Sequence, residues 1–190
     1  MSLNLLKKLN KPGFTTEEAR HLGVSPRMLG YYTQRGQIKR LSHGVYAFPK
    51  ALGIDLESII REKLIAIPQA IVGLKTALRL HDLTEETPAE IELMVPLRNK
   101  PKRKLTDVKF YQVKDAIYKR GVTRFHDIPV TTVERTIIDF LRTGASIAFV
   151  LGILNAAKSK RIPVELPQLK RLAKTFRVKA KVEQLMDALL

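Results

Sequence analysis

The chain has 190 residues, 45% of them apolar, which is enough for a packed core and excludes a disordered, collagen-like or miniprotein chain. It carries 34 Lys and Arg against 18 Asp and Glu, a formal net charge of +16, and its lack of cysteine excludes disulfides, thiolate zinc sites and thiol catalysis. The longest uncharged stretch, 143–157, is too short to span a bilayer, and the N-terminus lacks the pattern of a secretory signal. We therefore expect a cytoplasmic protein with no membrane partner.

So large a positive charge favours an anionic partner, and a nucleic acid is the commonest one for a chain of this size. The basic residues are concentrated in segments 1–50, 97–125 and 158–181, which carry net charges of +7, +8 and +8. The segments between them are nearly neutral or acidic. A solvated basic surface is the alternative interpretation.

The first helices of the chain show the signals of a helix-turn-helix. Leucines recur at helical spacing over 3–9, and Pro-Gly at 12–13 ends that helix. Thr15 or Thr16 can cap a short second helix, and Gly23 suits the left-handed residue that ends it. A third helix follows after a Gly-Val-Ser turn, and two short helices joined in this way are typical of a helix-turn-helix.

The third helix, predicted from Pro26 to about Arg35, has one core face and one polar, positive face. Ser25 caps it, and proline at the first helical position costs no hydrogen bond. The residues whose spacing turns them to the core are Leu29, Tyr32 and Thr33. The residues left facing outward are Arg27, Met28, Tyr31, Gln34 and Arg35.

An outward face of this kind can enter the major groove of DNA, where residues near the helix N-terminus reach base edges. Arg27 is the expected reader of guanine. The full set that we assign to base reading is Ser25, Arg27, Met28 and Tyr31, and Gln34 and Arg35 are assigned to the DNA backbone. An ordinary exposed helix face is the alternative.

Two strand-like segments, 38–41 and 45–48, flank a Ser-His-Gly turn and predict a β-hairpin. A basic hairpin directly after a recognition helix is typical of the wing of a winged helix. The residues that we expect beside phosphates are Thr15 and Thr16 at the start of the second helix and Lys39, Arg40 and His43 in the hairpin.

This order of residues resembles the AbiEi-type antitoxins, the regulator partners of type IV toxin–antitoxin systems. In the N-terminal part the resemblance rests on Phe14-Thr15-Thr16, Gly23-Val24-Ser25, Leu29, Arg35-Gly36-Gln37-Ile38, Leu41 and Gly44-Val45-Tyr46. In the second half it rests on segments 77–84, 88–96 and 128–139, the last with a Thr-x-Glu-Arg-Thr core at 132–136. It spans roughly residues 3–142.

The resemblance implies a winged helix followed by an antitoxin domain. It also implies a repressor of its own operon that binds promoter inverted repeats as two or more copies, without a cofactor. The toxin that it counteracts would be a nucleotidyltransferase-fold enzyme, and neutralisation need not involve a stable complex between the two proteins.

The rest of the chain predicts a second, α+β domain, so we place the domains at 1–50 and 51–190. The helices that we expect cover about 55–66, 71–81, 132–142, 146–158, 167–174 and 180–189. The strands that we expect cover 90–95, 108–113 and 122–126. The fold class is therefore α+β, an N-terminal winged helix-turn-helix followed by a domain of helices around a small sheet.

A second group of cations in this domain can extend the contact with phosphates, or can simply be solvated. Its members are Lys102, Arg103, Lys104, Lys158, Lys160, Arg161, Lys170, Arg171 and Lys174.

No catalytic, metal or cofactor motif accompanies these cations, so we expect no enzyme activity, and the four histidines show no metal-ligand spacing. Glu90 and Glu92 lie on one face of a strand, as in metal-dependent nucleases, but we expect them on the solvent face of an edge strand. Asp139 is expected to pair with Arg135 or a nearby backbone group. The alternatives to a sequence-specific repressor are a general nucleic-acid-binding protein and a nuclease-like protein.

Overall fold

The computed structural model describes residues 2–9, 13–49, 55–99, 101, 105 and 107–188. By its contacts the chain divides into an N-terminal unit, Met1–Gln69, and a C-terminal unit, Ala70–Leu190. Helix α4 (Leu56–Ala66) belongs to the N-terminal unit because it packs against all three strands of that unit. The division therefore lies later in the chain than the predicted boundary between 1–50 and 51–190.

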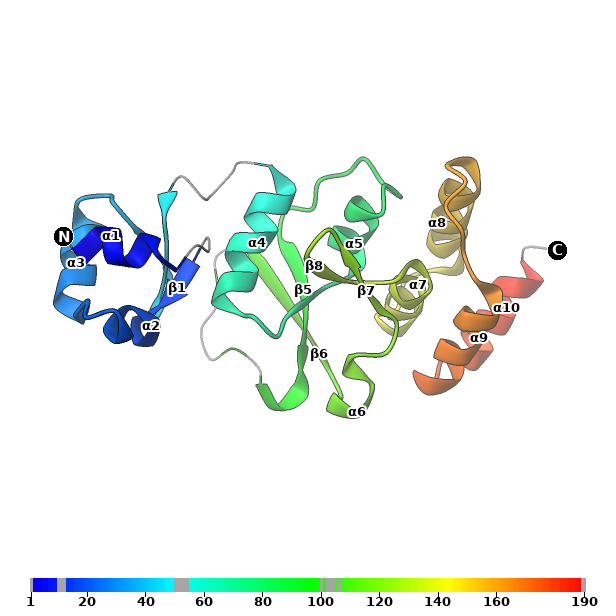
Figure 1. Ribbon diagram of the computed structural model, residues 1–190. Helices are drawn as coiled ribbons and strands as arrows, with labels where there is room; N and C mark the ends of the chain where they lie inside the picture. The colour runs from blue at the N-terminus through cyan, green and yellow to red at the C-terminus, as the bar shows by residue number, and fades with distance from the viewer. Residues whose placement is uncertain are drawn as a thin grey trace. The chain divides into compact units, whose positions relative to one another are not determined.

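The N-terminal unit combines short helices with a three-stranded antiparallel sheet in the order β1-β3-β2 (Figure 1). Besides α4, its elements are α1 (Ser2–Lys7), β1 (Gly13–Thr15), α2 (Thr16–His21), α3 (Pro26–Gln34), β2 (Lys39–Ser42) and β3 (Val45–Ala47). The predicted order of helices and the hairpin are present. Strand β1 was not predicted from the residue pattern, since three residues are too few to show alternation.

Residues from every part of the helix-turn-helix meet in the core of this unit. Its fully buried side chains include Leu6, Phe14, Ala19, Val24, Leu29 and Ile38. The ring of Phe14 on β1 stacks on that of Tyr46 on β3, with 5.9 Å between centroids. The hairpin is therefore fixed to the helices by packing as well as by backbone hydrogen bonds.

The C-terminal unit contains a five-stranded mixed sheet in the order β6-β5-β4-β8-β7. Its strands are β4 (Ile71–Val72), β5 (Ile91–Pro96), β6 (Val108–Val113), β7 (Val122–Phe125) and β8 (Ile128–Thr131). Its helices are α5 (Leu74–Leu80), the 3-10 turn η2 (Leu97–Asn99), α6 (Asp115–Tyr118), α7 (Val133–Arg142), α8 (Ile147–Ser159), α9 (Leu166–Thr175) and α10 (Lys179–Asp187). The α+β class is confirmed.

Strands β5–β6 and β4–β8 pair in parallel, whereas β4–β5 and β7–β8 are antiparallel. The helix predicted from residue 71 is wrong at its start, because Ile71 and Val72 form β4. Gly73 follows that strand, and a Cβ at this position would lie 2.6 Å from the Met94 side chain, so a larger residue would require Met94 to shift. Within the described residues, no helix has the length and apolar character needed to cross a bilayer.

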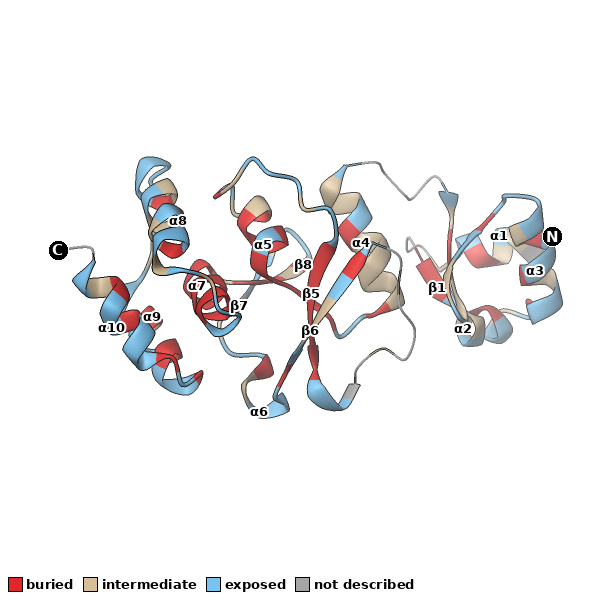
Figure 2. Cartoon of the chain, turned by 180° about the vertical axis from the view of Figure 1, so that it is seen from behind, coloured by how far each residue is buried: buried red, intermediate tan, exposed pale blue. Residues whose placement is uncertain are grey.

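Figure 2 shows that β5 and α7 are almost wholly buried. Every residue of α7 from Val133 to Leu141 is buried, including the charged side chains of Glu134, Arg135 and Asp139. A helix that is buried on all sides must satisfy these charges internally. Glu134 does so by accepting from the backbone N–H of Glu165, at 2.8 Å.

Arg135 and Asp139 form a buried ion pair, as predicted. Nε of Arg135 donates to Oδ2 of Asp139 at 2.8 Å, and Nη1 of Arg142 donates to Oδ1 at 2.9 Å. Nη1 of Arg135 also donates to the carbonyls of Ile117 and Arg120, and its guanidinium lies over the ring of Phe176, 4.0 Å from the centroid. Burial lowers the pKa of Arg135 and raises the pKa of Asp139, whereas the contact between the two opposes both shifts and Arg142 also lowers the pKa of Asp139.

The turn before β7 closes over this pair. Gly121 has φ +63°, and a Cβ there would lie 2.7 Å from the Cβ of Arg135 and 3.1 Å from Cδ1 of Leu172 on α9. Its carbonyl accepts from the backbone N–H of Thr132, the N-cap of α7, at 2.9 Å. The turn, α7 and α9 are therefore held at one point, where both the conformation and the space require glycine.

We expect Asp139→Asn to lower the free energy of unfolding of the C-terminal unit by about 3 to 5 kcal/mol, because it leaves the buried Arg135 charge without its counter-ion. Urea denaturation followed by circular dichroism measures this loss. Arg142→Ala is the matched control, since it removes the more exposed partner and should cost about 1 kcal/mol or less. A similar loss in both variants would contradict the special role of the buried pair.

Candidate nucleic-acid interface

Helix α3 presents the outward face that its sequence predicts. Ser25 is its N-cap, with Oγ accepting from the backbone N–H of Met28 at 3.3 Å, and Pro26 is in the first turn. Leu29 and Tyr32 are buried and anchor the helix. The opposite face therefore points to solvent, and its exposed residues are Arg27, Tyr31, Gln34 and Arg35.

The two ends of this face differ in how firmly their cations are held. Arg27, in the first turn, is exposed and extends from a capped helix end. At the C-cap of α3, the Arg35 guanidinium lies 4.7 Å from the centroid of the Tyr31 ring, which is 44% exposed. Met28 is half-buried and packs on the core, so it has less freedom to reach a base than predicted.

The N-terminus of α2 is already occupied by a capping box. The Thr15 hydroxyl accepts from the backbone N–H of Glu18 at 3.2 Å, and Thr15 N–H donates to the Glu18 carboxylate at 2.7 Å. Thr16 donates to the carbonyl of Gly44 through its backbone N–H, at 2.8 Å, and its hydroxyl. A phosphate here would meet the Glu18 charge, so these threonines serve local structure first, and their contact with DNA stays a prediction.

The hairpin places two predicted residues side by side at its tip. Nη2 of Arg40 lies 3.2 Å from Nδ1 of His43, and its Nε donates to the carbonyl of Ser42 at 3.3 Å. Since a guanidinium cannot accept a hydrogen bond, Nδ1 of His43 is the acceptor and Nε2 carries the proton. Lys39 is 56% exposed, and its Nζ lies 3.3 Å from Glu62 of α4. The tip thus offers N–H donors of Arg40 and His43, and Lys39 would exchange a carboxylate for a phosphate.

The structure divides the predicted second group of cations. Lys102, Arg103 and Lys104 lie outside the described residues. Lys158 and Arg161 are exposed at the end of α8, and the intervening Lys160 pairs with Asp82 at 2.9 Å. On α9, Lys170 and Lys174 line a groove of about 330 Å³ against α10 that also contains two acidic residues, Glu183 and Asp187. Arg171 is exposed on α9 but does not line this groove.

Of the two glutamates predicted on one strand, only Glu92 lies within β5. Glu92 is buried and accepts from the backbone N–H of Lys75 at 2.6 Å and from the Tyr111 hydroxyl at 2.9 Å. The prediction of a solvent-exposed edge strand is wrong here, because β5 lies between β4 and β6. Glu90 is exposed and precedes the strand. Within the part of the chain that the structure describes, no cluster of three His, Asp or Glu can hold a metal ion.

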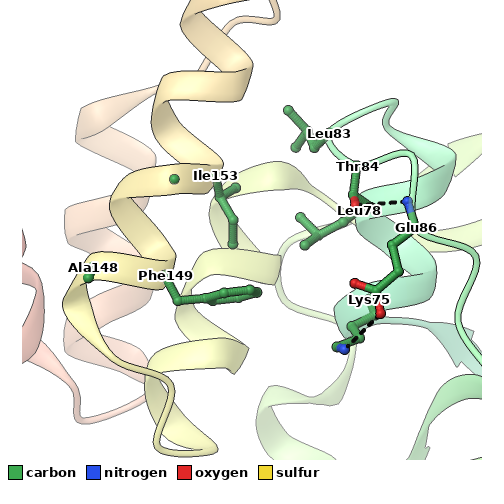
Figure 3. A pocket seen from close by; sticks show the side chains of 9 residues that line it. Lys75, Leu78, Leu83, Thr84, Glu86, Ala148, Phe149 and Ile153 are labelled. Atoms are coloured by element: carbon green, nitrogen blue, oxygen red, sulfur yellow. Dashed lines mark hydrogen bonds and ion pairs between the residues drawn. The ribbon is translucent and has the colours of Figure 1, made fainter.

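A second hollow, of about 240 Å³, lies between α5 and α8 (Figure 3). Its walls are mostly apolar, formed by Leu78, Leu83, Phe149 and Ile153. Its polar side carries an ion pair of 3.4 Å between Lys75 and Glu86.

A measurement of stability can test the capping role of Ser25 separately from any contact with a base. Because its hydroxyl caps α3, Ser25→Ala should lower the free energy of unfolding of the N-terminal unit by about 1 kcal/mol, and Ser25→Gly by only a few tenths of that. Thermal or urea unfolding measures both. Equal stability of Ser25→Ala and the unaltered protein would contradict the capping role and leave base contact as its function.

The crystal structure of the RV2827C protein from Mycobacterium tuberculosis is similar to this chain, with a TM-score of 0.65 and 13% sequence identity. The similarity covers 90% of this chain and 69% of that one, and at this identity it shows the fold alone. No curated protein matches the chain.

The model of a family described as transcriptional regulator, AbiEi antitoxin, matches residues 6–49. This segment includes β1, α2, α3 and the hairpin β2–β3. The predicted resemblance is confirmed there: in residues 6–49 this chain matches the AbiEi antitoxin family of transcriptional regulators.

Proposed function

We propose that this protein is a sequence-specific DNA-binding antitoxin that represses its own operon. The observation that carries the proposal is the exposed cationic face of α3, capped at Ser25 and anchored by Leu29 and Tyr32, beside a basic hairpin. The family match over 6–49 supports it.

In this proposal α3 lies in the major groove, with its N-terminus toward the bases. Arg27 donates in a bidentate manner to guanine, and Tyr31 contacts a neighbouring base or thymine methyl. Gln34 and Arg35 lie about two helical turns beyond Arg27 and contact the DNA backbone. The position of Arg35 at the C-cap of α3 supports this division.

The hairpin supplies the contacts that set the register of α3 on the duplex. Arg40 and His43 present N–H donors at the tip, and both suit phosphate oxygens or a narrow minor groove. The bond between Thr16 and Gly44 links this tip to α2, so the hairpin and the helices bind as one rigid piece.

The biological role in the proposal follows from the family resemblance. Two or more copies would occupy promoter inverted repeats in the cytoplasm, and the protein would counteract a nucleotidyltransferase-type toxin without a cofactor and without catalysis of its own. The engagement of Glu92 with Lys75 and Tyr111 supports a non-enzymatic role, because this carboxylate is not free to bind a metal.

We expect Arg27→Ala to weaken binding to the promoter by about 1 to 3 kcal/mol and to flatten discrimination against a scrambled duplex, because a bidentate base contact is lost. Fluorescence-anisotropy titrations with both duplexes measure the effect. Arg20→Ala, an exposed arginine at the end of α2, is the matched control and should keep the discrimination. Equal losses on both duplexes for Arg27→Ala would rule out base reading and favour general nucleic-acid binding.

Arg40→Ala should instead reduce the slope of log K against log salt by about 0.9, the value for one phosphate contact, and leave the ratio of specific to scrambled binding unchanged. Arg40→Lys retains the charge and should retain the slope. If Arg40→Lys loses as much slope as Arg40→Ala, the charge of this residue does not meet a phosphate.

A further inference from the structure

We propose that Glu62 of α4 acts as an internal substitute for a DNA phosphate: it holds Lys39 of the hairpin and thereby weakens the binding of the N-terminal unit to DNA. The inference rests on the proposed function, because it describes the regulation of the same DNA-binding surface. No sequence motif marks Glu62, and it lies outside residues 6–49, which match the family model.

The carboxylate of Glu62 accepts from Lys39 through both of its oxygens. Nζ of Lys39 donates to Oε2 at 3.3 Å and to Oε1 at 3.5 Å. The side chain of Glu62 is only 18% exposed, whereas that of Lys39 is 56% exposed. Because the protein already restricts the glutamate side chain, this pair loses less side-chain entropy than a pair between two mobile surface residues.

Packing of α4 on the sheet fixes this carboxylate beside the hairpin. Helix α4 contacts all three strands of the N-terminal unit, including β2, which contains Lys39. Ile60 of α4 is fully buried, and the side chain of Ile65 lies against Gly13 of β1, where a Cβ would be 2.5 Å from it. The position of Glu62 therefore follows from the fold of this unit.

A second lysine allows Lys39 to leave without stranding the carboxylate. Nζ of Lys63, the next residue on α4, lies 3.7 Å from Oε1 of Glu62, and the side chain of Lys63 is 17% exposed. Removing the partner of a sheltered charge is costly when no other group compensates that charge. Since Lys63 stays beside Glu62, Lys39 can exchange the carboxylate for a phosphate and return to it when the DNA dissociates.

This contact sets Lys39 apart from the other cations that we expect at the DNA. Between the described residues, no ion pair includes Arg27, Arg35 or Arg40, whereas Lys39 is paired with Glu62. A phosphate that contacts Lys39 must first displace this carboxylate, so part of the electrostatic gain of binding is lost. Glu62 thus lowers the affinity for DNA without contacting it.

The test is a double-mutant cycle in the full chain, measured by fluorescence-anisotropy titration on one promoter duplex. We expect Glu62→Gln to tighten binding by about threefold to fivefold, because Lys39 is then released from an ion pair of ordinary surface strength. The same substitution in a Lys39→Gln background should leave the affinity nearly unchanged, since the residue that Glu62 holds is already absent.

The matched control is Glu57→Gln, which removes the same charge from the same helix. Glu57 lies about 140° around the helix axis from Glu62, and it pairs with Arg61 of α4 at 3.0 Å. Its substitution should tighten binding by less than about 1.5-fold, because salt screens the remaining long-range effect of one surface charge.

Equal gains from Glu62→Gln with and without Lys39 would overturn the proposal, because they would reflect only the loss of a negative charge. An unchanged affinity in a folded Glu62→Gln variant, checked by circular dichroism, overturns it as well. If the unaltered protein binds promoter and scrambled duplexes equally, sequence-specific binding fails, yet the cycle on either duplex still tests the hold of Glu62 on Lys39. A preserved promoter preference without coupling between the two residues overturns this inference alone.

Discussion

The C-terminal unit depends on one buried contact, the pair of Arg135 and Asp139 inside α7. Taking two charges out of water costs several kcal/mol for each, and partners inside the protein must offset that cost. Nη2 of Arg135 is buried and has no hydrogen-bond partner among the described residues, so the other contacts of the pair carry this load. Asp139 supplies one charge, the carbonyls of Ile117 and Arg120 accept from the other, and Phe176 covers the guanidinium. Because these partners come from α6, its following turn and the end of α9, the pair fixes elements that are distant in the chain.

In the N-terminal unit, packing and helix caps hold α3 with one face toward solvent. Leu29 and Tyr32 bury one side of α3, and the caps at Thr15 and Ser25 each satisfy one free backbone N–H group at the start of a short helix. Short helices are marginal alone, so the packing of Phe14 on Tyr46 is what makes the face of α3 a fixed surface. The protein itself therefore holds the face of α3 in place, without any contact with DNA.

The basic residues of the chain do not all contribute equally to the positive field around it. Where a carboxylate lies within reach, as for Lys160 and Asp82, the cation is paired and contributes little field. Where none does, as along α3, the charge stays available to a phosphate. The net charge predicts an anionic partner, and the pairing of individual residues decides which surfaces can meet it.

The sequence by itself determined the features that depend on neighbours along the chain: the cap at Ser25, the burial of Leu29 and Tyr32, the hairpin, and the pairing of Asp139 with Arg135 four residues earlier. Each is set by helical spacing or by turn chemistry, and both act over a few residues. Only the tertiary structure decided that Glu92 is buried, that α4 joins the N-terminal unit, and that the turn at Gly121 packs against Leu172 of α9. These depend on strand order and on contacts between distant segments, which no local pattern encodes.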